Sequence, residues 1–206
     1  MISRVFTERS PTVRSDALAR RERIITAACE LFSTNAHNVS LDTVAERAQV
    51  GIATLYRNFP DRTALLVACG GRFFAEAQQL QDDVLKYFHT NPEHWWYTYV
   101  DGLVNMGVSI LVSSFAPDDL STLPAEVADA RALASSKGEK IIAMAKDAGL
   151  VHKDVHHNTF IVGLITVTRP PVPGIVALEP NITHNLVDLF LSGLKHGSMR
   201  GLRYPD

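Results

Sequence analysis

Hydrophobic residues recur every three or four positions along most of this chain, which is the spacing of an α-helix with one buried face. The longest such pattern runs over residues 62–88, and Asn91 and Pro92 end it. No stretch alternates polar and apolar residues for long enough to require a strand. The pattern therefore predicts an all-α fold. The repeating positions of residues 62–88 are Leu66, Cys69, Phe73, Ala77, Leu80, Val84 and Phe88.

The same spacing predicts several more helices. Ser40 is a good N-cap for a short helix, and a turn over residues 49–51 follows that helix. Further helices are expected near residues 16–32, 52–59, 93–114, 124–148, 155–168 and 181–196.

Glycine, asparagine and proline mark the expected ends and breaks of these helices. Gly138 is a candidate break in the segment 124–148. Gly149 is placed to terminate that segment, and Asn181 to begin the last helix. The stretch RPPVPG, residues 169–174, is expected to be a loop because its three prolines remove backbone donors.

The stretch GIATLYRNFPDR, residues 51–62, is unusual because so short a helix carries so many polar side chains. At 100° per residue, its apolar residues fall within an arc of roughly 60° that faces a core. A small outward face that ends in an arginine is suited to enter a DNA major groove, while the alternative is an ordinary surface helix in a three-helix unit. The predicted inward residues are Ile52, Leu55 and Phe59, the outward ones are Ala53, Thr54 and Arg57, and Tyr56 and Asn58 lie on the flanks.

Composition indicates one or two compact, soluble domains. The chain has 206 residues, 46% of them hydrophobic and 20% charged. Residues 103–115 form its longest nearly apolar stretch, which is too short for the ~20 residues that span a bilayer, and the N-terminus has no apolar signal core. The cysteines are Cys29 and Cys69, both inside helical patterns, so we expect a reducing compartment and a cytoplasmic protein.

The net charge of −2 conceals an asymmetry between the two parts of the chain. Residues 1–72 hold ten arginines, no lysine and seven acids, whereas the remainder is net negative. Guanidinium groups bind phosphate and guanine edges in bidentate fashion, so the excess of arginine over acidic residues suits a surface that binds nucleic acid. Judged on charge alone, chance clustering of arginines on a solvated face is an equally good explanation. Arg62 lies in the first turn of its helix, where the helix dipole disfavours a cation by about 0.3–1 kcal/mol, so either a phosphate or a nearby acid such as Asp61 should accompany it.

The segment RRERIITAACELFSTNAHNVSLDTVAERAQVGIATLYRNFPDRTALL, residues 20–66, resembles the DNA-binding domain of the tetracycline-repressor (TetR) family of transcriptional regulators. It is especially similar to the branch whose third helix reads GVGIGTLYRHFPTR. The resemblance implies a homodimer of all-helical subunits, each with a helix-turn-helix domain at residues 16–62 and a ligand-binding and dimerisation domain at residues 63–197. An N-terminal arm at residues 1–15 and a tail at residues 198–206 would flank them. Such proteins usually repress genes and release a palindromic operator when a small molecule binds.

Residue roles follow from this resemblance. Thr54 and Arg57 match base-reading positions, and Gln49 and Ala53 replace the usual glycines of the turn and of the closest approach to DNA. The arginines of the N-terminal segment, Arg4, Arg9 and Arg14, would form either a minor-groove arm or a solvated terminus. The full predicted DNA-binding set is Ser40, Thr43, Gly51, Ala53, Thr54, Tyr56, Arg57, Asn58 and Arg62.

The resemblance weakens after Leu66. The pattern AKDAGLVHKDVHHNT is similar to a turn between two late helices of the same branch. Helices 155–168 and 181–196 would pair with their copies across a two-fold axis, and an intramolecular core is the alternative. The predicted dimer residues are Ile161, Leu164, Ile165, Leu186, Leu189, Phe190, Gly193 and Leu194, and the predicted ligand contacts are Trp96, Tyr99, Met106 and Ile110.

Two other readings remain open. His152, His156 and His157 are close in sequence, but no set of ligands with metal spacing accompanies them at what reads as an exposed turn, so we expect no metal and no cofactor. Ser113, Asp101 and His94 supply the residue types of a hydrolytic triad without its sequence signature. The sequence thus favours a DNA-binding regulator over a helical enzyme or an interaction module with an unused helix-turn-helix.

Overall fold

A computed structural model describes residues 11–35, 39–115, 120–170 and 173–197, and all regular structure in these ranges is helical, as predicted. The chain divides into two compact units, Met1–Cys69 (the first unit) and Gly70–Asp206 (the second unit). The boundary lies seven residues beyond the one expected at residue 62. This shift arises because Leu65 and Cys69 are fully buried, and the Cys69 thiol lies 4.0 Å from the Ile25 carbonyl oxygen in the first unit.

The first unit is built from α1 (Pro11–Asn35), α2 (Leu41–Arg47), α3 (Ile52–Asn58) and the start of α4 (Arg62–Tyr87). Helix α1 packs against α2, and α2 packs against α3. Helix α1 begins five residues before the predicted start, so residues 11–15 are helical rather than part of an arm, and Arg4 and Arg9 lie outside the described residues. The fully buried side chains of this unit include Ile24, Ala28, Phe32, Val44 and Leu55.

The connection between α2 and α3 is tight. Ser40 caps α2 as predicted, because its Oγ accepts a hydrogen bond from the Thr43 backbone nitrogen at 3.1 Å. After α2, Gln49 adopts a φ of 55°, a left-handed conformation in which non-glycine residues are uncommon. The turn therefore keeps a left-handed residue although the sequence has glutamine there.

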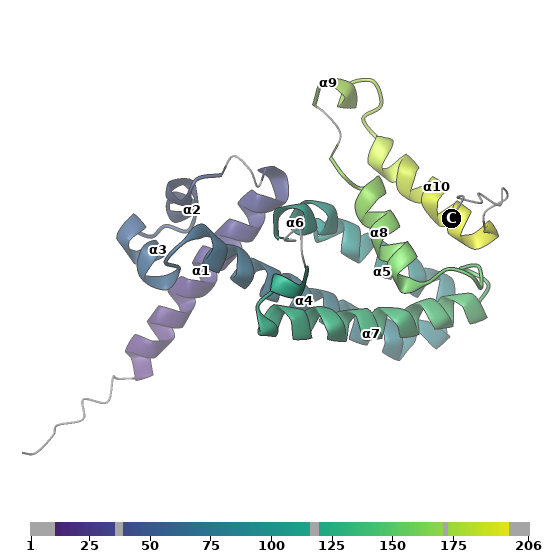
Figure 1. Cartoon of the computed structure of the whole chain (residues 1–206), viewed down its shortest axis with the longest axis horizontal. Helices are drawn as coiled ribbons and strands as arrows, with labels where there is room; N and C mark the ends of the chain where they lie inside the picture. The colour runs from purple at the N-terminus through teal and green to yellow at the C-terminus, as the bar shows by residue number, and fades with distance from the viewer. Residues whose placement is uncertain (1–10, 36–38, 116–119, 171–172, 198–206) are drawn as a thin grey trace, which may run out of the picture. The chain divides into compact units, whose positions relative to one another are not determined.

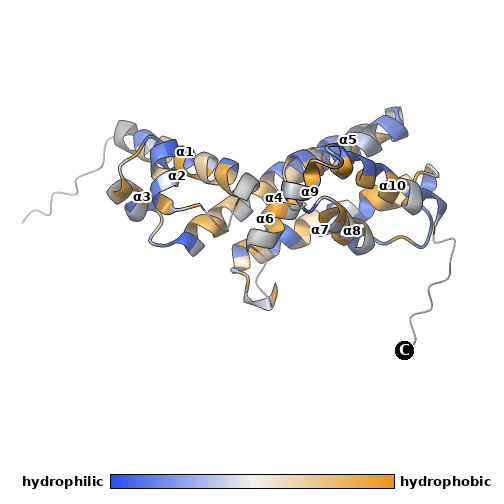
Figure 2. Ribbon diagram, turned by 90° about the horizontal axis from the view of Figure 1, so that it is seen from above, coloured by the Kyte–Doolittle hydropathy of each residue, from blue (hydrophilic) through white to orange (hydrophobic). Residues whose placement is uncertain are grey.

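The second unit contains the rest of α4 followed by α5 (Pro92–Asn105), α6 (Val108–Phe115), α7 (Ala125–Asp147), α8 (His157–Val167) and α10 (Ile182–His196). Short helical turns, η2 (Phe88–Thr90), η3 (Leu120–Thr122) and α9 (Pro173–Val176), connect them. Helix α8 packs against α6, α7 and α10, and α8 and α10 lie side by side in Figure 1. Hydrophobic and hydrophilic residues are interspersed along α1, α5 and α7, as expected for helices that bury one face (Figure 2).

Several predicted boundaries in the second unit are wrong. The expected helix at residues 93–114 is two helices, because Gly107 takes a φ of 69° between α5 and α6. Helix α7 runs unbroken through Gly138. Within the RPPVPG stretch, Pro173 begins the single turn α9. Gly149, with a φ of 70°, follows the end of α7 as predicted, whereas Asn181 precedes α10 without a capping hydrogen bond from its side chain.

Candidate nucleic-acid interface and internal cavity

Helix α3 presents a polar face to solvent. Leu55 and Phe59 are 0% and 1% exposed, which confirms them as its inward residues. Ala53, Tyr56 and Arg57 are exposed, and Thr54 is half-buried. Ile52 departs from the prediction, since it is 37% exposed at the first position of the helix.

Contacts within the first unit hold α3 in place. The Arg21 guanidinium lies 4.7 Å from the centre of the Phe59 ring, at the end of the helix. At its start, the backbone nitrogens of Thr54 and Leu55 donate to the Gly51 carbonyl. The Asn58 side-chain nitrogen donates to the Thr54 carbonyl at 2.8 Å, so one of its hydrogens is used within α3. The predicted contact of Asn58 with DNA therefore relies on the second hydrogen and the oxygen of this amide.

Arg57 differs from the other arginines near it. Arg47 forms an ion pair with Glu30 at 2.7 Å, and the Arg20 Nε donates to the Asp16 carbonyl. No acceptor or carboxylate within the described part of the chain pairs with Arg57. Its guanidinium is available to an external acceptor.

Arg62 lies at the start of α4 but is bound within the first unit. Its guanidinium lies 4.7 Å from the centre of the Phe32 ring and donates to the carbonyl of Val39, the residue before Ser40. The Asp61 carboxylate caps α4 by accepting from the Ala64 nitrogen at 2.7 Å. These contacts account for a cation in a first turn without a phosphate, and they tie α4 to the beginning of α2.

The remaining predicted DNA contacts lie at the starts of the two short helices. Ser40 Oγ and Thr43 Oγ1 are 2.9 Å apart at the first turn of α2, and this hydrogen bond is exposed. Gly51 precedes α3 with an extended backbone, and a Cβ atom added there would meet nothing within 4 Å. Packing within the subunit therefore does not require glycine at position 51.

The second unit contains a cavity of about 310 Å³. This lies at the lower end of the roughly 300–1,000 Å³ typical of small-molecule sites. Its wall is mostly hydrocarbon, contributed by α4 to α8 and the 120–123 turn. The apolar lining side chains are Phe73, Phe74, Ala77, Leu103, Val108, Val112, Leu120, Leu123, Val127, Ala134, Ile161, Val162 and Ile165.

Three buried polar side chains interrupt this apolar wall: Gln81, Tyr99 and His157. Gln81 Nε2 donates to the Ala134 carbonyl at 2.9 Å and to the Tyr99 hydroxyl at 3.3 Å. Burial raises the pKa of Tyr99 to about 12, so the phenol is neutral. Burial also lowers the pKa of His157 below its ordinary value, against the opposing influence of the Glu139 charge.

Only part of the predicted ligand set lies at this cavity. Tyr99 lines it, while Met106 and Ile110 line neither this cavity nor the smaller groove described below. Gln81 and His157 were not predicted as ligand contacts. For Gln81 the sequence does hold a signal, because it lies four residues after Ala77 and three before Val84, on the buried side of the α4 pattern.

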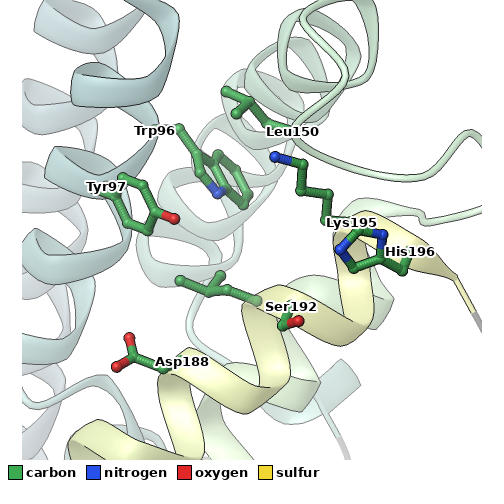
Figure 3. A pocket seen from close by; sticks show the side chains of 8 residues that line it. Trp96, Tyr97, Leu150, Asp188, Ser192, Lys195 and His196 are labelled. Carbon is green, nitrogen blue, oxygen red and sulfur yellow. The ribbon is translucent and has the colours of Figure 1, made fainter.

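A second, smaller groove of about 240 Å³ lies between α5 and α10 (Figure 3). Trp96 and Tyr97 line one side and Asp188 and Ser192 the other, and Lys195 reaches from α10 toward Leu150 and Trp96. Trp96 thus contributes to this groove rather than to the larger cavity. The polar side chains of the groove are exposed, in contrast to the buried Gln81, Tyr99 and His157 of the larger cavity.

The predicted dimer residues separate into three groups by exposure. Leu164 and Leu194 are 0% and 7% exposed, so the structure corrects their assignment and places them in the core of the subunit. Leu189 and Leu186 are 69% and 37% exposed on α10, and Gly193 is exposed beside them. The other three, Ile161, Ile165 and Phe190, are half-buried.

Phe190 has a packing role of its own. Its ring occupies the space above Gly163 of α8, where an added Cβ atom would come within 2.5 Å of the ring, and it stacks with Phe160 at 6.4 Å. Phe190 therefore helps to join α8 and α10 within one subunit.

The three clustered histidines do not converge. His157 is buried, which corrects the expected exposed turn, while His156 is exposed and the His152 Nδ1 lies 3.5 Å from the Asp154 carboxylate. The described residues contain no group of three or more side chains suited to hold a metal ion. The triad candidates His94 and Asp101 are both exposed on α5, and the side chain of Ser113 lies outside the described residues.

Among the described helices, none is long and apolar enough to cross a membrane. The fold thus presents a helix-turn-helix unit whose second helix exposes an arginine without a partner among the described residues, followed by a helical unit with a mostly apolar cavity.

Comparison with protein families agrees with this architecture. Residues 24–69 match the model of the "Bacterial regulatory proteins, tetR family". Residues 91–196, half of the chain, match the model "Transcriptional regulator SbtR-like, C-terminal domain". The chain belongs to the TetR family of transcriptional regulators.

Individual relatives are similar mainly in the first unit. The chain is 45% identical over 56 residues to the HTH-type transcriptional repressor KstR of Mycolicibacterium smegmatis, covering 27% of this chain and 28% of that protein. It is 39% identical over 79 residues to KstR of Rhodococcus jostii, covering 35% of this chain and 37% of that protein. The chain thus matches only about a third of the length of these curated relatives.

Solved structures resemble a larger part of the chain. A TetR regulatory protein from Mycobacterium vanbaalenii superposes with a TM-score of 0.56 at 24% identity, over 88% of this chain and 98% of that one. The regulator SCO0520 from Streptomyces coelicolor gives a TM-score of 0.50 at 25% identity, over 84% of this chain and 97% of that one. The fold of both units is therefore that of TetR regulators.

Proposed function

We propose that this protein is a ligand-responsive transcriptional regulator that represses its target genes. In this proposal it binds a palindromic DNA operator as a homodimer and leaves the operator when a small molecule occupies the cavity of the second unit. The family supports this function over the alternatives of a helical enzyme or an interaction module.

The observation that carries the proposal is the outward face of α3. Leu55 and Phe59 fix the inward side of the helix, so Ala53, Thr54 and Arg57 face away from the core. The groove-facing residues of a recognition helix need to be small enough for close approach and to include donors that reach base edges. Gly51 is consistent with a DNA contact. No atom of the subunit would prevent a side chain at that position, so packing within the subunit does not explain the glycine.

The other predicted contacts complete the proposed interface. Ser40 and Thr43 place two exposed hydroxyl groups at the first turn of α2, and Tyr56 is 50% exposed beside Arg57. These groups are proposed to bind backbone phosphates and so to set the register of α3. Arg62 is proposed to act mainly within the protein, by holding the start of α2.

Dimerisation is proposed to use the exposed part of α8 and α10. Val162, Leu186 and Leu189 are 59%, 37% and 69% exposed on these adjacent helices. A two-fold contact repeats each apolar residue on both copies, so these side chains would cover one another. The net charges of the two parts of the chain agree with these proposed roles. Residues 1–72, which contain the proposed DNA-binding face, are net positive, and the remainder, which contains the proposed dimer contact, is net negative.

An electrophoretic mobility-shift assay with genomic fragments tests the proposal. The full-length protein should retard a small set of fragments at concentrations that leave most fragments free. Arg57→Ala should weaken this selectivity, while Lys140→Ala, a change of equal charge on the exposed part of α7, should leave it intact. Retardation of all fragments alike, or of none, by the wild-type protein would contradict the proposal.

A further inference from the structure

Gln81 and Tyr99, which are hydrogen-bonded to each other, form a polar end of the cavity, and His157 is a third buried polar side chain on its wall. Gln81 of α4, Tyr99 of α5 and His157 of α8 are 2%, 1% and 5% exposed, and all three line the cavity. Their hydrogen bonds can be assigned to donors and acceptors, which shows what a ligand must offer there.

The Gln81 amide has a defined orientation. The Ala134 carbonyl only accepts hydrogen bonds, so the amide atom 2.9 Å from it must be the nitrogen. The nitrogen uses its second hydrogen on the Tyr99 hydroxyl at 3.3 Å. This leaves the Gln81 Oε1 atom without a donor among the described residues, and bulk solvent does not reach it.

Tyr99 complements that oxygen. Its hydroxyl oxygen accepts from Gln81, so its own hydrogen remains to be donated. Burial favours the neutral phenol and keeps this hydrogen in place. A free acceptor on Gln81 and a free donor on Tyr99 therefore lie next to each other.

His157 adds a third polar group to the cavity. Its Nδ1 atom is also without a partner among the described residues and closed to solvent. Buried polar atoms are nearly always hydrogen-bonded, so two unpaired atoms on side chains that line one cavity indicate a place for a polar ligand group. The Gln81 Oε1 atom is closed to a water molecule in this structure, so the amide must rotate about its soft last torsion before its oxygen can meet such a group.

Helix packing alone does not explain Gln81. Gln78, one turn earlier on α4, donates to the Ala130 carbonyl of α7 at 3.0 Å and does not line the cavity. It ties the same two helices together in the same way. Gln78 is therefore a matched control that separates the helix contact from the cavity contact.

The cavity disfavours an ion at this end. Arg131 is the single charged side chain among its described lining residues, and it is exposed. Burial of an unpaired charge is costly, whereas a neutral group that donates one hydrogen bond and accepts another satisfies both Gln81 and Tyr99. Hydroxyl groups have this property. At the ~30 Å³ that a water molecule occupies in the liquid, a volume of about 310 Å³ holds at least about ten heavy atoms.

We infer that the cavity binds a neutral, largely apolar alcohol or phenol, whose hydroxyl group donates to Gln81 Oε1 and accepts from the Tyr99 hydroxyl. His157, whose Nδ1 atom is also unpaired, lines the same cavity and disfavours purely apolar ligands. This inference rests on the proposed function, because the alcohol or phenol would be the effector that releases DNA.

Calorimetric titration of the full-length protein with three matched probes tests the chemistry. The probes are 4-propylphenol, propylbenzene and 4-propylbenzoate, which share one apolar body. The phenol should bind about tenfold more tightly than either other probe, as one neutral hydrogen bond allows. Gln81→Met should remove this preference, whereas Gln78→Met should retain it, although both variants lose one contact between α4 and α7. Tyr99→Phe should weaken phenol binding without changing the affinity for propylbenzene.

Two results would overturn the inference. One is equal affinity for the phenol and propylbenzene in the wild type, which would mean that the polar end does not bind the ligand. The other is tightest binding of the benzoate with loss of that preference in Arg131→Gln, which would place the polar contact at the exposed arginine.

A parallel mobility-shift assay distinguishes the ligand proposal from the proposed regulatory function. Selective DNA binding without any phenol preference refutes only the ligand class, and phenol binding without selective DNA binding refutes only the regulator.

Discussion

His157 fills the space that Gly138 leaves free on α7, since a Cβ atom added at position 138 would lie 2.1 Å from His157 Nε2. Glycine in the middle of a helix normally costs stability relative to alanine. Here it permits a buried imidazole at the wall of the cavity. The two residues are 19 positions apart in sequence, and the fold makes them neighbours.

Gly138→Ala should therefore destabilise the second unit by about 1–3 kcal/mol, because the imidazole or the helix must move. Gly71→Ala on α4 is the control, since a Cβ atom there would meet nothing within 4 Å. Its higher helix propensity should leave stability unchanged or raise it by up to about 1 kcal/mol. Urea unfolding followed by circular dichroism measures both changes, and equal effects of the two variants would contradict the packing argument.

The pH dependence of stability should contain a contribution from His157. Its pKa in the folded protein is below the ordinary value of 6.5, mainly because of burial, so the unfolded chain binds the proton more readily. Stability is therefore unaffected above about pH 6.5 and falls as the pH drops below it. The loss from this group at pH 5.5 is at most about 1.4 kcal/mol, the value of one pH unit.

The matched comparison is His157→Gln with His156→Gln. Because His156 is exposed, its replacement should leave the difference in unfolding free energy between pH 7.5 and 5.5 as it is in the wild type. Replacement of His157 should reduce that difference. If the two variants show the same pH dependence, His157 is not the responsible group.

Arg62→Ala should lower the stability of the first unit by about 1–2 kcal/mol. The change removes a cation–π contact with Phe32 and a hydrogen bond to the Val39 carbonyl. Arg57→Ala, which removes an exposed arginine from the same unit, should leave the melting temperature unchanged.

The salt dependence of DNA binding separates the two possible roles of Arg62. If Arg62 acts within the protein, the slope of log affinity against log salt for the folded variant should equal that of the wild type. A slope flatter by about one unit would show that Arg62 also neutralises a phosphate.

Leu189→Glu should convert the dimer into a folded monomer. Leu189 is 69% exposed in the subunit, so the change costs little in the monomer, while a two-fold contact would bury the new charge twice. Leu133→Glu on α7, which is 49% exposed, is the control and should remain dimeric. Analytical ultracentrifugation reports the mass of each variant. If both variants are dimers, Leu189 of α10 is not part of the interface.

Local patterns predicted much of the first unit correctly. Ser40 is a cap whose signal lies within three residues, and Leu55 and Phe59 follow from helical spacing alone. Gln49 shows where this reasoning stops. The sequence has no glycine at that position, yet the backbone between α2 and α3 takes a left-handed conformation there.

The cavity could not be predicted in the same way. Tyr99 was expected at a ligand site, but its neighbours Gln81 and His157 come from helices that are far apart in sequence. Their pairing depends on how α4, α5 and α8 pack, which no local spacing encodes. For the same reason Leu164 and Leu194, apolar positions of two predicted dimer helices, were not recognised as core residues.

The last prediction concerns base recognition by α3. Arg57 is exposed and unpaired among the described residues, and Ala53 and Thr54 leave room beside it for close approach to DNA. Guanine is the expected target, because its O6 and N7 atoms match the guanidinium fork, and one bidentate contact discriminates by about 1–3 kcal/mol.

The operator should then be an inverted repeat with a G·C pair at a matching position in each half-site. Arg57→Ala should relax the preference at that pair alone while binding random DNA almost as well as the wild type. Selection from a random DNA library, with wild type and variant in parallel, measures this. Enrichment of the same base at every position by both proteins would assign specificity to Thr54, Asn58 or DNA shape instead.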